Sequence, residues 1–421
     1  MESIATSARP IEAASRETVG PVEPDSRLVE VDMVRGFALF GVLLVNMYGY
    51  GAASLAWSSP ADRTAFGIMH VFFESKSWTL FALLFGWSFA LQLERSRAGG
   101  LPTVPTYLRR LTALFALGTV HVLLYDGDIL MLFAELGLGL LLVRRLSTRT
   151  LLVLAAGLML VFPLFRLASA GVRPDGSNAV RTARAQLEWM QSTDVYAVGS
   201  FAEIVSENAT TIPANPLEDV DTPESGLAVF AMFLVGFSVG RAGLLRDIPG
   251  NRAVFARLRA WGLGLGLGAM AVEQVLAATA GYEVFREQRA GPWAQLAGDL
   301  LFVAGTTALA LGYAAALVLA ARSRRDRSAL APLAAVGRLA LTVYLTQSLL
   351  FTTLFYPYGF GKAYRLGPVA VTGWAVAFFA LQVVACRWWS RRFQFGPTEW
   401  LWRSLIYLRW QPLRLPDPSA P

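Results

Sequence analysis

The stretch RRLTALFALGTVHVLLYDGDIL, residues 109–130, shows how this chain is built. Two arginines open it, a mostly apolar run follows, and the turn Asp126-Gly-Asp128 closes it. A membrane-spanning helix needs about 20 mostly apolar residues. We therefore predict a membrane helix at 108–125, with its arginines at one membrane face and its acidic turn at the other.

The composition of the 421 residues supports this reading. Hydrophobic residues make up 55% of the chain and charged residues 16%, whereas a typical soluble protein has roughly 45–50% and about 25%. The apolar residues gather in long blocks, which excludes a disordered chain, a collagen and a disulfide scaffold. The sequence predicts an all-α polytopic membrane protein whose main partner is the lipid bilayer.

Ten segments are candidates for membrane helices. They are 36–57, 66–93, 108–125, 129–143, 150–170, 226–245, 258–280, 293–320, 332–355 and 368–389. Every second loop between them is rich in arginine, which marks a cytoplasmic loop. Ten membrane helices with both termini cytoplasmic fit this alternation. The net charge of +7 is therefore read as an orientation signal, with no nucleic-acid partner.

This pattern divides the chain into five parts. They are a disordered cytoplasmic tail (1–26), an N-terminal membrane region with five helices (27–170), an extracytoplasmic acidic loop (171–225), a C-terminal membrane region with five helices (226–389) and an amphipathic cytoplasmic tail (390–421). The tail 1–26 lacks the apolar core of a signal peptide. In the second tail, an amphipathic helix is expected to lie on the inner membrane surface.

Ionisable residues inside membrane helices are costly and are candidates for function. His121 is the first of these, since a histidine accepts and returns protons near neutral pH. Asp126 or Asp128 would fix its tautomer, as in a His–Asp catalytic pair. Glu135 lies inside a short predicted helix and needs a partner, either an arginine or His121. A histidine hydrogen-bonded to a loop at the membrane interface is the structural alternative.

The first predicted helix carries three further candidates. Asp32 and Arg35 lie three residues apart on one face, where they can pair. The alternative is a cytoplasmic anchor in which Asp32 caps the helix. Asn46 lies near mid-membrane, where it needs a neighbouring helix or a substrate as partner.

The second predicted helix begins with His70, Glu74 and Lys76. His70 and Glu74 share a face and form either a proton-handling pair or a wet rim at the membrane surface. The polar run Ser75-Lys76-Ser77 before a long apolar stretch favours the rim.

The ninth predicted helix contains Arg338 and Gln347. Arg338 is expected to reach toward the cytoplasm, and Gln347 to hydrogen-bond between helices. Tyr344, Tyr356 and Tyr358 read as interfacial aromatics. The single Cys386 excludes a disulfide within the chain and a cysteine-ligated zinc site, and we predict no metal centre.

Several segments together resemble one family of bacterial membrane proteins. They are RLVEVDMVRGFALFGVLLVN, LFALLFG, RRLTALFALGTVHVLLYDGDIL and GRLALTVYLTQSL with the C-terminal FYPYGFG and RWWSRRFQFGPTEWLWRSLIY. These motifs resemble the YeiB-like family, from about Arg27 to Arg409. That family is distantly similar to transmembrane acyltransferases.

The resemblance implies a multi-pass protein of the bacterial inner (plasma) membrane. It implies transfer of an acyl group from cytoplasmic acetyl-CoA or another acyl-CoA to a hydroxyl or amine acceptor, which is a small molecule, lipid or sugar. His121 becomes the implied catalytic group, and no tightly bound cofactor is expected. Two alternatives stay open: a small-molecule transporter or exporter, and a non-enzymatic membrane partner protein. The oligomeric state is left open.

Overall fold

A computed structural model of the chain describes residues 28–51, 59–98, 103–171, 195–210, 212, 226–280 and 292–415. Within these ranges the fold is helical, and strand pairing is limited to one isolated bridge between Phe393 and Arg414. The helices are α1 (Val29–Gly51), α2 (Pro60–Phe72), α3 (Lys76–Ala98), α4 (Thr103–Leu124), α5 (Leu130–Val143), α6 (Thr148–Met159), α7 (Val161–Gly171), α9 (Phe201–Ala209), α10 (Gly226–Arg241), α11 (Arg252–Ala280), α12 (Pro292–Ala320), α13 (Arg324–Arg338), α14 (Ala340–Phe355), α15 (Pro368–Trp389) and α16 (Pro397–Tyr407). The predicted all-α class is confirmed for this part of the chain.

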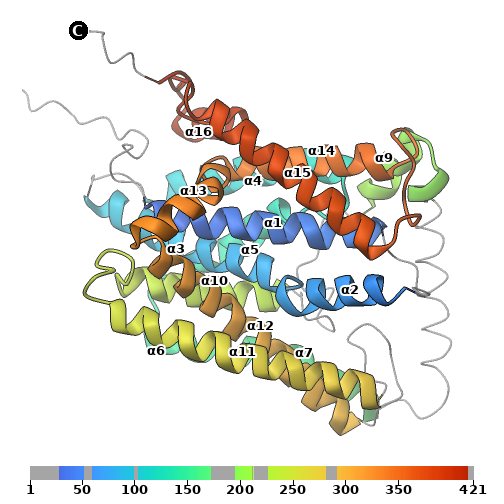
Figure 1. The fold of residues 1–421 in the computed structure, drawn as a ribbon. Helices are drawn as coiled ribbons and strands as arrows, with labels where there is room; N and C mark the ends of the chain where they lie inside the picture. Colours follow the sequence, from blue (N-terminus) through green and yellow to red (C-terminus); the bar gives the residue numbers. More distant parts are fainter. Residues whose placement is uncertain are drawn as a thin grey trace, which may run out of the picture.

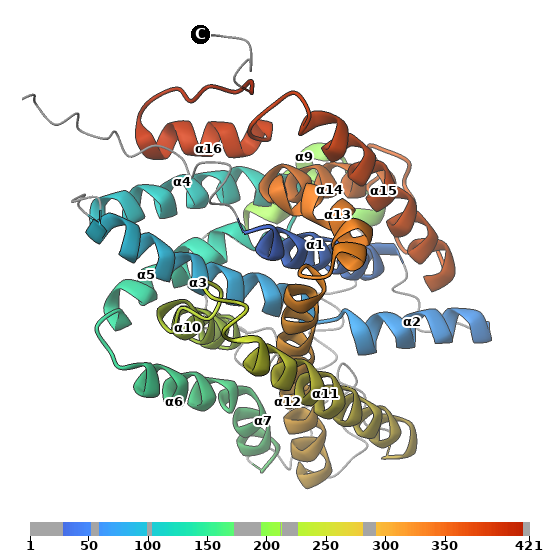
Figure 2. The same cartoon turned by 60° about the vertical axis from the view of Figure 1, so that its left-hand side comes forward.

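The helices form a bundle around a central layer (Figure 1). In that layer α1 packs on α3, and α3 packs closely on α10. The pair α11 and α12 packs together along one side of the bundle, whereas α16 lies at another edge against α4 and α14 (Figure 2). The elements α1, α3, α4, α13, α14 and α16 therefore come together from both ends of the sequence.

Several helices are long and apolar enough to cross a membrane, which marks the chain as a membrane protein. Among the described residues four meet this condition: Val104–Leu124, Thr148–Ser169, Pro292–Ala320 and Pro368–Trp389. A fifth is added if the bent pair α13 and α14 counts as one span. Each of the ten expected segments contains a helix, but the number of crossings and the orientation of the termini stay predictions.

The expected helix at 66–93 is divided in two. The helix is interrupted between α2 and α3, where Ser75 adopts a left-handed backbone conformation with φ of 60°. The Lys76 side chain bridges the break by donating from Nζ to the carbonyl oxygen of His70 at 2.9 Å. Around this turn His70, Glu74 and Lys76 are buried, whereas Phe72 is exposed.

The expected helix at 332–355 is also divided. Helices α13 and α14 meet at Leu339 with a bend of 80°. The expected helix at 150–170 is likewise interrupted at Leu160, between α6 and α7. Pro163 explains this second break, because its ring nitrogen cannot donate the hydrogen bond that a continuous helix would place there.

Two glycines allow α1 and α13 to approach closely. A Cβ atom at Gly36 would lie 2.0 Å from the carbonyl oxygen of Leu333, and one at Gly337 would lie 1.8 Å from that of Asp32. Only glycine fits such backbone-to-backbone contact, which is a common packing device between membrane helices. The contact fixes Arg35 and Arg338 beside the same internal space.

Some predicted parts fall outside the described residues. These are the tail 1–26 and most of the acidic loop 171–225. Within that loop the described residues form α9, which begins at a capping box between Ser200 and Glu203. Hydrogen bonds from Ser200 lower the pKa of the Glu203 carboxyl. In the C-terminal tail, the expected helix is present as α16.

Candidate functional site

His121 and Asp128 form a buried pair where α4 meets the turn before α5. The distance from His121 Nδ1 to Asp128 Oδ1 is 2.7 Å. The other oxygen of Asp128 accepts a hydrogen bond of 2.8 Å from the backbone nitrogen of Met131, in the first turn of α5. Both carboxylate oxygens are therefore held in place, and the predicted His–Asp geometry is present.

The second ring nitrogen of His121 has no hydrogen-bond partner among the described residues. His121 is 5% exposed, and its Nε2 is buried with no hydrogen bond to a described residue. Because an ionised carboxylate can only accept, Nδ1 carries the hydrogen toward Asp128. A neutral imidazole in this tautomer presents Nε2 as a proton acceptor.

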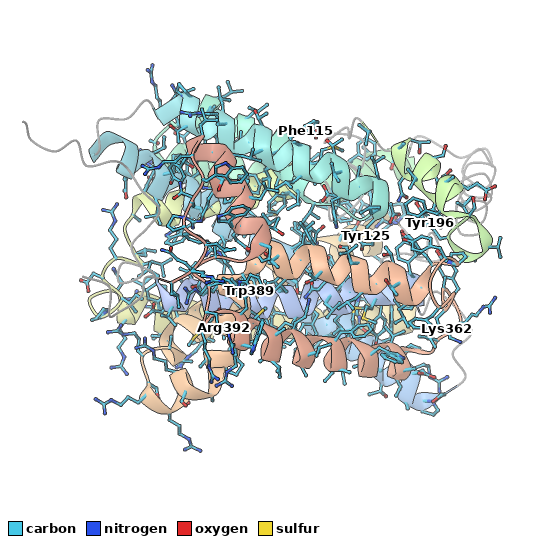
Figure 3. All side chains as sticks on the ribbon, turned by 90° about the horizontal axis from the view of Figure 1, so that it is seen from above. Phe115, Tyr125, Tyr196, Lys362, Trp389 and Arg392 are labelled. Carbon is cyan, nitrogen blue, oxygen red and sulfur yellow. The ribbon has the colours of Figure 1, made fainter. Side chains whose placement is uncertain are left out.

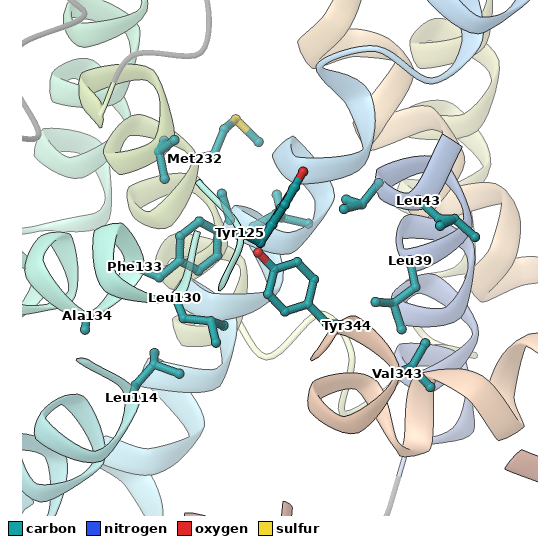
Figure 4. Close-up of a cluster of buried hydrophobic side chains, with 14 of the residues drawn as sticks. Leu39, Leu43, Leu114, Tyr125, Leu130, Phe133, Ala134, Met232, Val343 and Tyr344 are labelled. Carbon is teal, nitrogen blue, oxygen red and sulfur yellow. The ribbon is translucent and has the colours of Figure 1, made fainter. Parts of the chain in front are cut away.

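Two tyrosine rings flank this histidine. The ring centroids of Tyr125 and Tyr344 lie 5.7 Å and 5.1 Å from that of His121. Figure 4 shows Tyr125 and Tyr344 facing each other from different parts of the fold. The Tyr344 hydroxyl accepts from the backbone nitrogen of Ile129 at 3.2 Å and donates to the carbonyl oxygen of Gly127 at 3.3 Å. Tyr344 thus ties α14 to the turn that carries Asp128.

The prediction of interfacial aromatics is wrong for two of three tyrosines. Tyr344 and Tyr356 are buried, whereas Tyr358 is exposed. Tyr356 instead packs in a cluster of tyrosine rings with Tyr50 and Tyr196. Sequence reasoning missed Tyr50 and Tyr196, because nothing in the local pattern predicts that they meet.

Asp126 has a different partner from Asp128. The hydroxyl of Tyr50 donates a hydrogen bond to its carboxylate. Burial raises the pKa of Asp126, and the hydrogen bonds from Tyr50 and the backbone of Gly127 offset part of that rise. Asp126 therefore joins the turn to α1, and its predicted contact with His121 is not present.

Glu135 does not join the His121 pair. Its side chain is half-buried on α5, and Oε2 has no hydrogen-bond partner within the described ranges. Neither of the predicted partners, an arginine or His121, bonds to Glu135 among the described residues. Glu135 therefore has no structural support as a catalytic residue.

A large cavity opens between α1, α3, α4, α13, α14 and α16. Its volume is about 930 Å³, and five arginines and three carboxylates line it. The charged lining residues are Asp32, Arg35, Glu94, Arg110, Arg246, Arg338, Glu399 and Arg403. Tyr344 and Ile129 also line it. We call the part of the cavity lined by Arg35, Arg110 and Arg338 its basic end. The cavity extends from there to Tyr344 and Ile129, which adjoin the His121–Asp128 pair.

Two predicted candidates hold the basic end together. Arg35 Nη1 lies 3.1 Å from Asp32 Oδ1, which confirms the predicted ion pair. Arg338 Nη2 donates to the carbonyl oxygen of Gln394 at 3.2 Å. Arg338 is thus anchored to the segment before α16. The sequence had predicted only that its side chain extends toward the cytoplasm.

Arg110 is an arginine of this cavity that the sequence did not single out. Its Nη1 donates to Gln92 Oε1 at 3.2 Å, and its guanidinium lies 5.0 Å from the Trp402 ring centroid. Its Nε is buried without a hydrogen-bond partner among described residues. The sequence placed the arginines at 109 and 110 at the cytoplasmic face without distinguishing them. In the structure Arg109 is exposed, whereas Arg110 lines the cavity.

A second, much smaller cavity lies on the other side of Tyr344. Asn46, Tyr125, Gln347 and Ser348 line it. Gln347 Nε2 donates to Gln382 Oε1 at 3.0 Å and to the carbonyl oxygen of Leu39 at 3.3 Å. The predicted interhelical role of Gln347 is confirmed. Asn46 faces this small cavity, which leaves both predicted roles open for it.

His70 and Glu74 lie apart from both cavities. They are buried at the junction of α2 and α3, and neither lines the space beside His121. The expectation of a wet rim is wrong for these side chains. Glu74 contacts His70 Nδ1, and the partner of His70 across the fold is Glu273 on α11.

Figure 3 shows the length of the bundle that separates these features. Tyr125, Tyr196 and Lys362 lie toward one end, and Trp389 and Arg392 lie toward the other. Tyr125, which flanks His121, therefore lies away from Trp389 and Arg392 along the bundle.

Known proteins are similar in sequence to this chain over nearly its full length. A protein named "Uncharacterized protein YxaH" from Bacillus subtilis (strain 168) is 32% identical, and the match covers 93% of this chain and 97% of the relative. "Uncharacterized protein YeiB" from Escherichia coli (strain K12) is 28% identical over 90% of this chain and 96% of the relative. The family described as "Protein of unknown function (DUF418)" matches residues 239–409. The chain belongs to the DUF418 family.

The DUF418 match covers only part of the candidate site. It includes α11–α16, with Arg338, Tyr344, Gln347 and Arg403. His121 and Asp128 lie before it, in the half that the full-length relatives also match. The site is thus built from a DUF418 segment and an N-terminal segment that pack together.

Proposed function

We propose that this DUF418 protein is a transmembrane acyltransferase that uses an acyl-CoA donor. The observation that carries the proposal is the buried His121–Asp128 pair: the His121 ring packs beside Tyr344, a residue of the large cavity, and its Nε2 has no hydrogen-bond partner among the described residues. A histidine held by a carboxylate is a suitable general base for acyl transfer.

The basic end of the cavity suits the phosphates of the donor. Arginine guanidinium groups bind phosphate through paired hydrogen bonds, and Arg35, Arg110 and Arg338 meet there. Arg110 and His121 are eleven residues apart on α4, so they lie roughly 16 Å apart along the helix axis. A donor with its phosphates near Arg110 would extend its acyl end toward Tyr344.

The proposed reaction uses His121 twice. Nε2 first takes the proton from an acceptor hydroxyl or amine, and the acceptor oxygen or nitrogen forms a bond to the thioester carbonyl carbon. The carbon–sulfur bond then breaks, and the proton on Nε2 passes to the leaving thiolate. Asp128 holds Nδ1 and stabilises the imidazolium between these steps.

The proposal includes an orientation in the bacterial inner membrane. Ten crossings with both termini in the cytoplasm would place the arginine end of α4 inside and His121 near the outer surface. The donor would then enter from the cytoplasm, and a small-molecule, lipid or sugar acceptor would meet it near the outer surface. The alternating basic loops support this arrangement.

Reconstitution into liposomes tests the proposal. Acyl-CoA is supplied on one side with a panel of alcohol and amine acceptors, and release of the free coenzyme A thiol is measured. The wild type should release thiol in the presence of an acceptor, and His121→Ala should lose this activity while it remains folded in the membrane. Full activity of His121→Ala would overturn the assignment. Acceptor flux without thiol release would instead favour the transporter, and neither signal with a co-purifying protein would favour a membrane partner.

A further inference from the structure

A second polar cluster lies at the junction of α2, α3 and α11. It contains His70, Glu74, Lys76 and Glu273, which are 5%, 8%, 0% and 1% exposed. Isolated charges are expensive to bury. The cluster is therefore stable only if its charges balance and its polar atoms find partners.

Both ring nitrogens of His70 face carboxylates. Nδ1 contacts the Glu74 carboxylate within the same turn, and Nε2 lies 3.5 Å from Glu273 Oε2 on α11. A neutral imidazole carries one hydrogen and can donate to only one of them. An imidazolium donates to both, so this geometry matches the protonated form of the ring.

The charge balance leads to the same form. Lys76 adds one positive charge, and Glu74 and Glu273 add two negative charges. With both carboxylates ionised, the group is neutral when His70 carries a second positive charge, and the two carboxylates facing its ring nitrogens favour the proton there. Loss of that proton would leave a net negative charge in a buried site, which low dielectric strongly disfavours.

In the part of the chain that the structure describes, no further cation is paired with His70. The rings of Phe66 and Phe302 flank it, and Gln274 donates to Glu273 Oε2 at 2.9 Å. On α12 the carboxylate of Asp299 is held by Arg166 of α7 at 3.1 Å. Lys76 Nζ donates to the His70 carbonyl oxygen, away from the ring nitrogens.

One carboxylate oxygen of Glu273 is not hydrogen-bonded to any described residue. Its Oε1 is buried and has no hydrogen-bond partner among the described residues. A carboxylate oxygen of this kind can accept a proton that leaves the imidazole. Chains of buried histidine and acidic residues in membrane helices are typical of proton transfer.

We propose that His70, Glu74 and Glu273 form a proton-binding site, separate from the His121 pair and independent of the proposed acyl transfer. The bound proton sits on His70 and joins α2 to α11. When it leaves, the contact between His70 Nε2 and Glu273 loses its hydrogen bond, so the proton also controls how α11 is held against α2.

Nuclear magnetic resonance of the histidine rings tests this proposal. The chain has two histidines, so the full-length His121→Gln variant, labelled with nitrogen-15 in its imidazoles and held in lipid nanodiscs, reports His70 alone. His70 should be an imidazolium at about pH 7.5, where an ordinary histidine is mostly neutral. A neutral His70 ring at that pH overturns the proposal.

Two isosteric variants show whether the carboxylates hold the proton. Glu273→Gln and Glu74→Gln should each lower the midpoint of the His70 titration by about one pH unit or more. Glu135→Gln is the matched control, since it removes another carboxyl group within the bundle and should leave the midpoint unchanged. Equal midpoints in the wild type and in both glutamine variants overturn the proposal.

Discussion

His121 and His70 are both buried beside a carboxylate, but they differ at the second ring nitrogen. In His121 the Nε2 atom has no partner among described residues and adjoins the aromatic wall of a large cavity. In His70 the Nε2 atom faces the carboxylate of Glu273. The partner of the second ring nitrogen thus decides whether a buried histidine can bind a substrate or is already bonded within the protein.

The largest expected effect separates the two carboxylates of the turn. Asp128→Asn should lower acyl transfer by about 10²–10⁴-fold, because the amide no longer fixes the His121 tautomer or stabilises its charged form. Asp126→Asn should cause a much smaller loss, since Asp126 is held by Tyr50. Rates are compared in the liposome assay, and equal losses in both variants would contradict the division of roles.

The next effect concerns stability of the second cluster. Glu273→Ala should reduce the free energy of unfolding by about 3–5 kcal/mol, because it leaves the buried His70 proton without its partner on α11. Thermal and denaturant unfolding in detergent micelles measure this loss. The wild-type stability in Glu273→Ala would show that the contact between α2 and α11 contributes little.

These two regions also show how far the sequence predicts the structure. The pairing of His121 with Asp128 follows from their short separation around one turn. The contact of His70 with Glu273 joins residues about 200 positions apart, and only the packing of α11 beside α2 creates it. The local pattern of apolar and polar residues does not predict that packing.

The helical membrane class was predictable because apolar blocks and arginine-rich loops are local signals. The positions of the breaks at Ser75 and Leu339 were not, since they depend on backbone turns that hydropathy does not detect. The cavity was also hidden. It needs Arg110 from α4 and Arg403 from α16 to face the same space, and no spacing in the sequence relates those helices.

A smaller effect is expected where α1 and α13 touch. Gly337→Ala should cost about 1–3 kcal/mol of stability, because the new Cβ would meet the carbonyl oxygen of Asp32. It should also weaken donor binding, since α13 carries Arg338 into the cavity. Gly264→Ala is the control, because no heavy atom outside its own helix lies within 4 Å of its added Cβ. Equal stability in the two variants would contradict the close contact.

The smallest effect tests the basic end of the cavity. Arg110→Lys should raise the KM for acyl-CoA by about tenfold with little change in kcat, because lysine keeps the charge but loses the paired geometry of the guanidinium. Arg109→Lys on the exposed side of α4 serves as the comparison. A similar KM in both variants would place the donor phosphates elsewhere.

A side-by-side assay of His121→Gln and His70→Gln tests whether acyl transfer depends on His121 and not on His70. Both proteins are reconstituted at equal folded amounts, and kcat/KM for transfer from acyl-CoA is measured. The account predicts a loss of about 10²–10⁴-fold in His121→Gln and a change within about threefold in His70→Gln, whose cluster shares no partner with the first. A large loss in His70→Gln with near wild-type transfer in His121→Gln would contradict it.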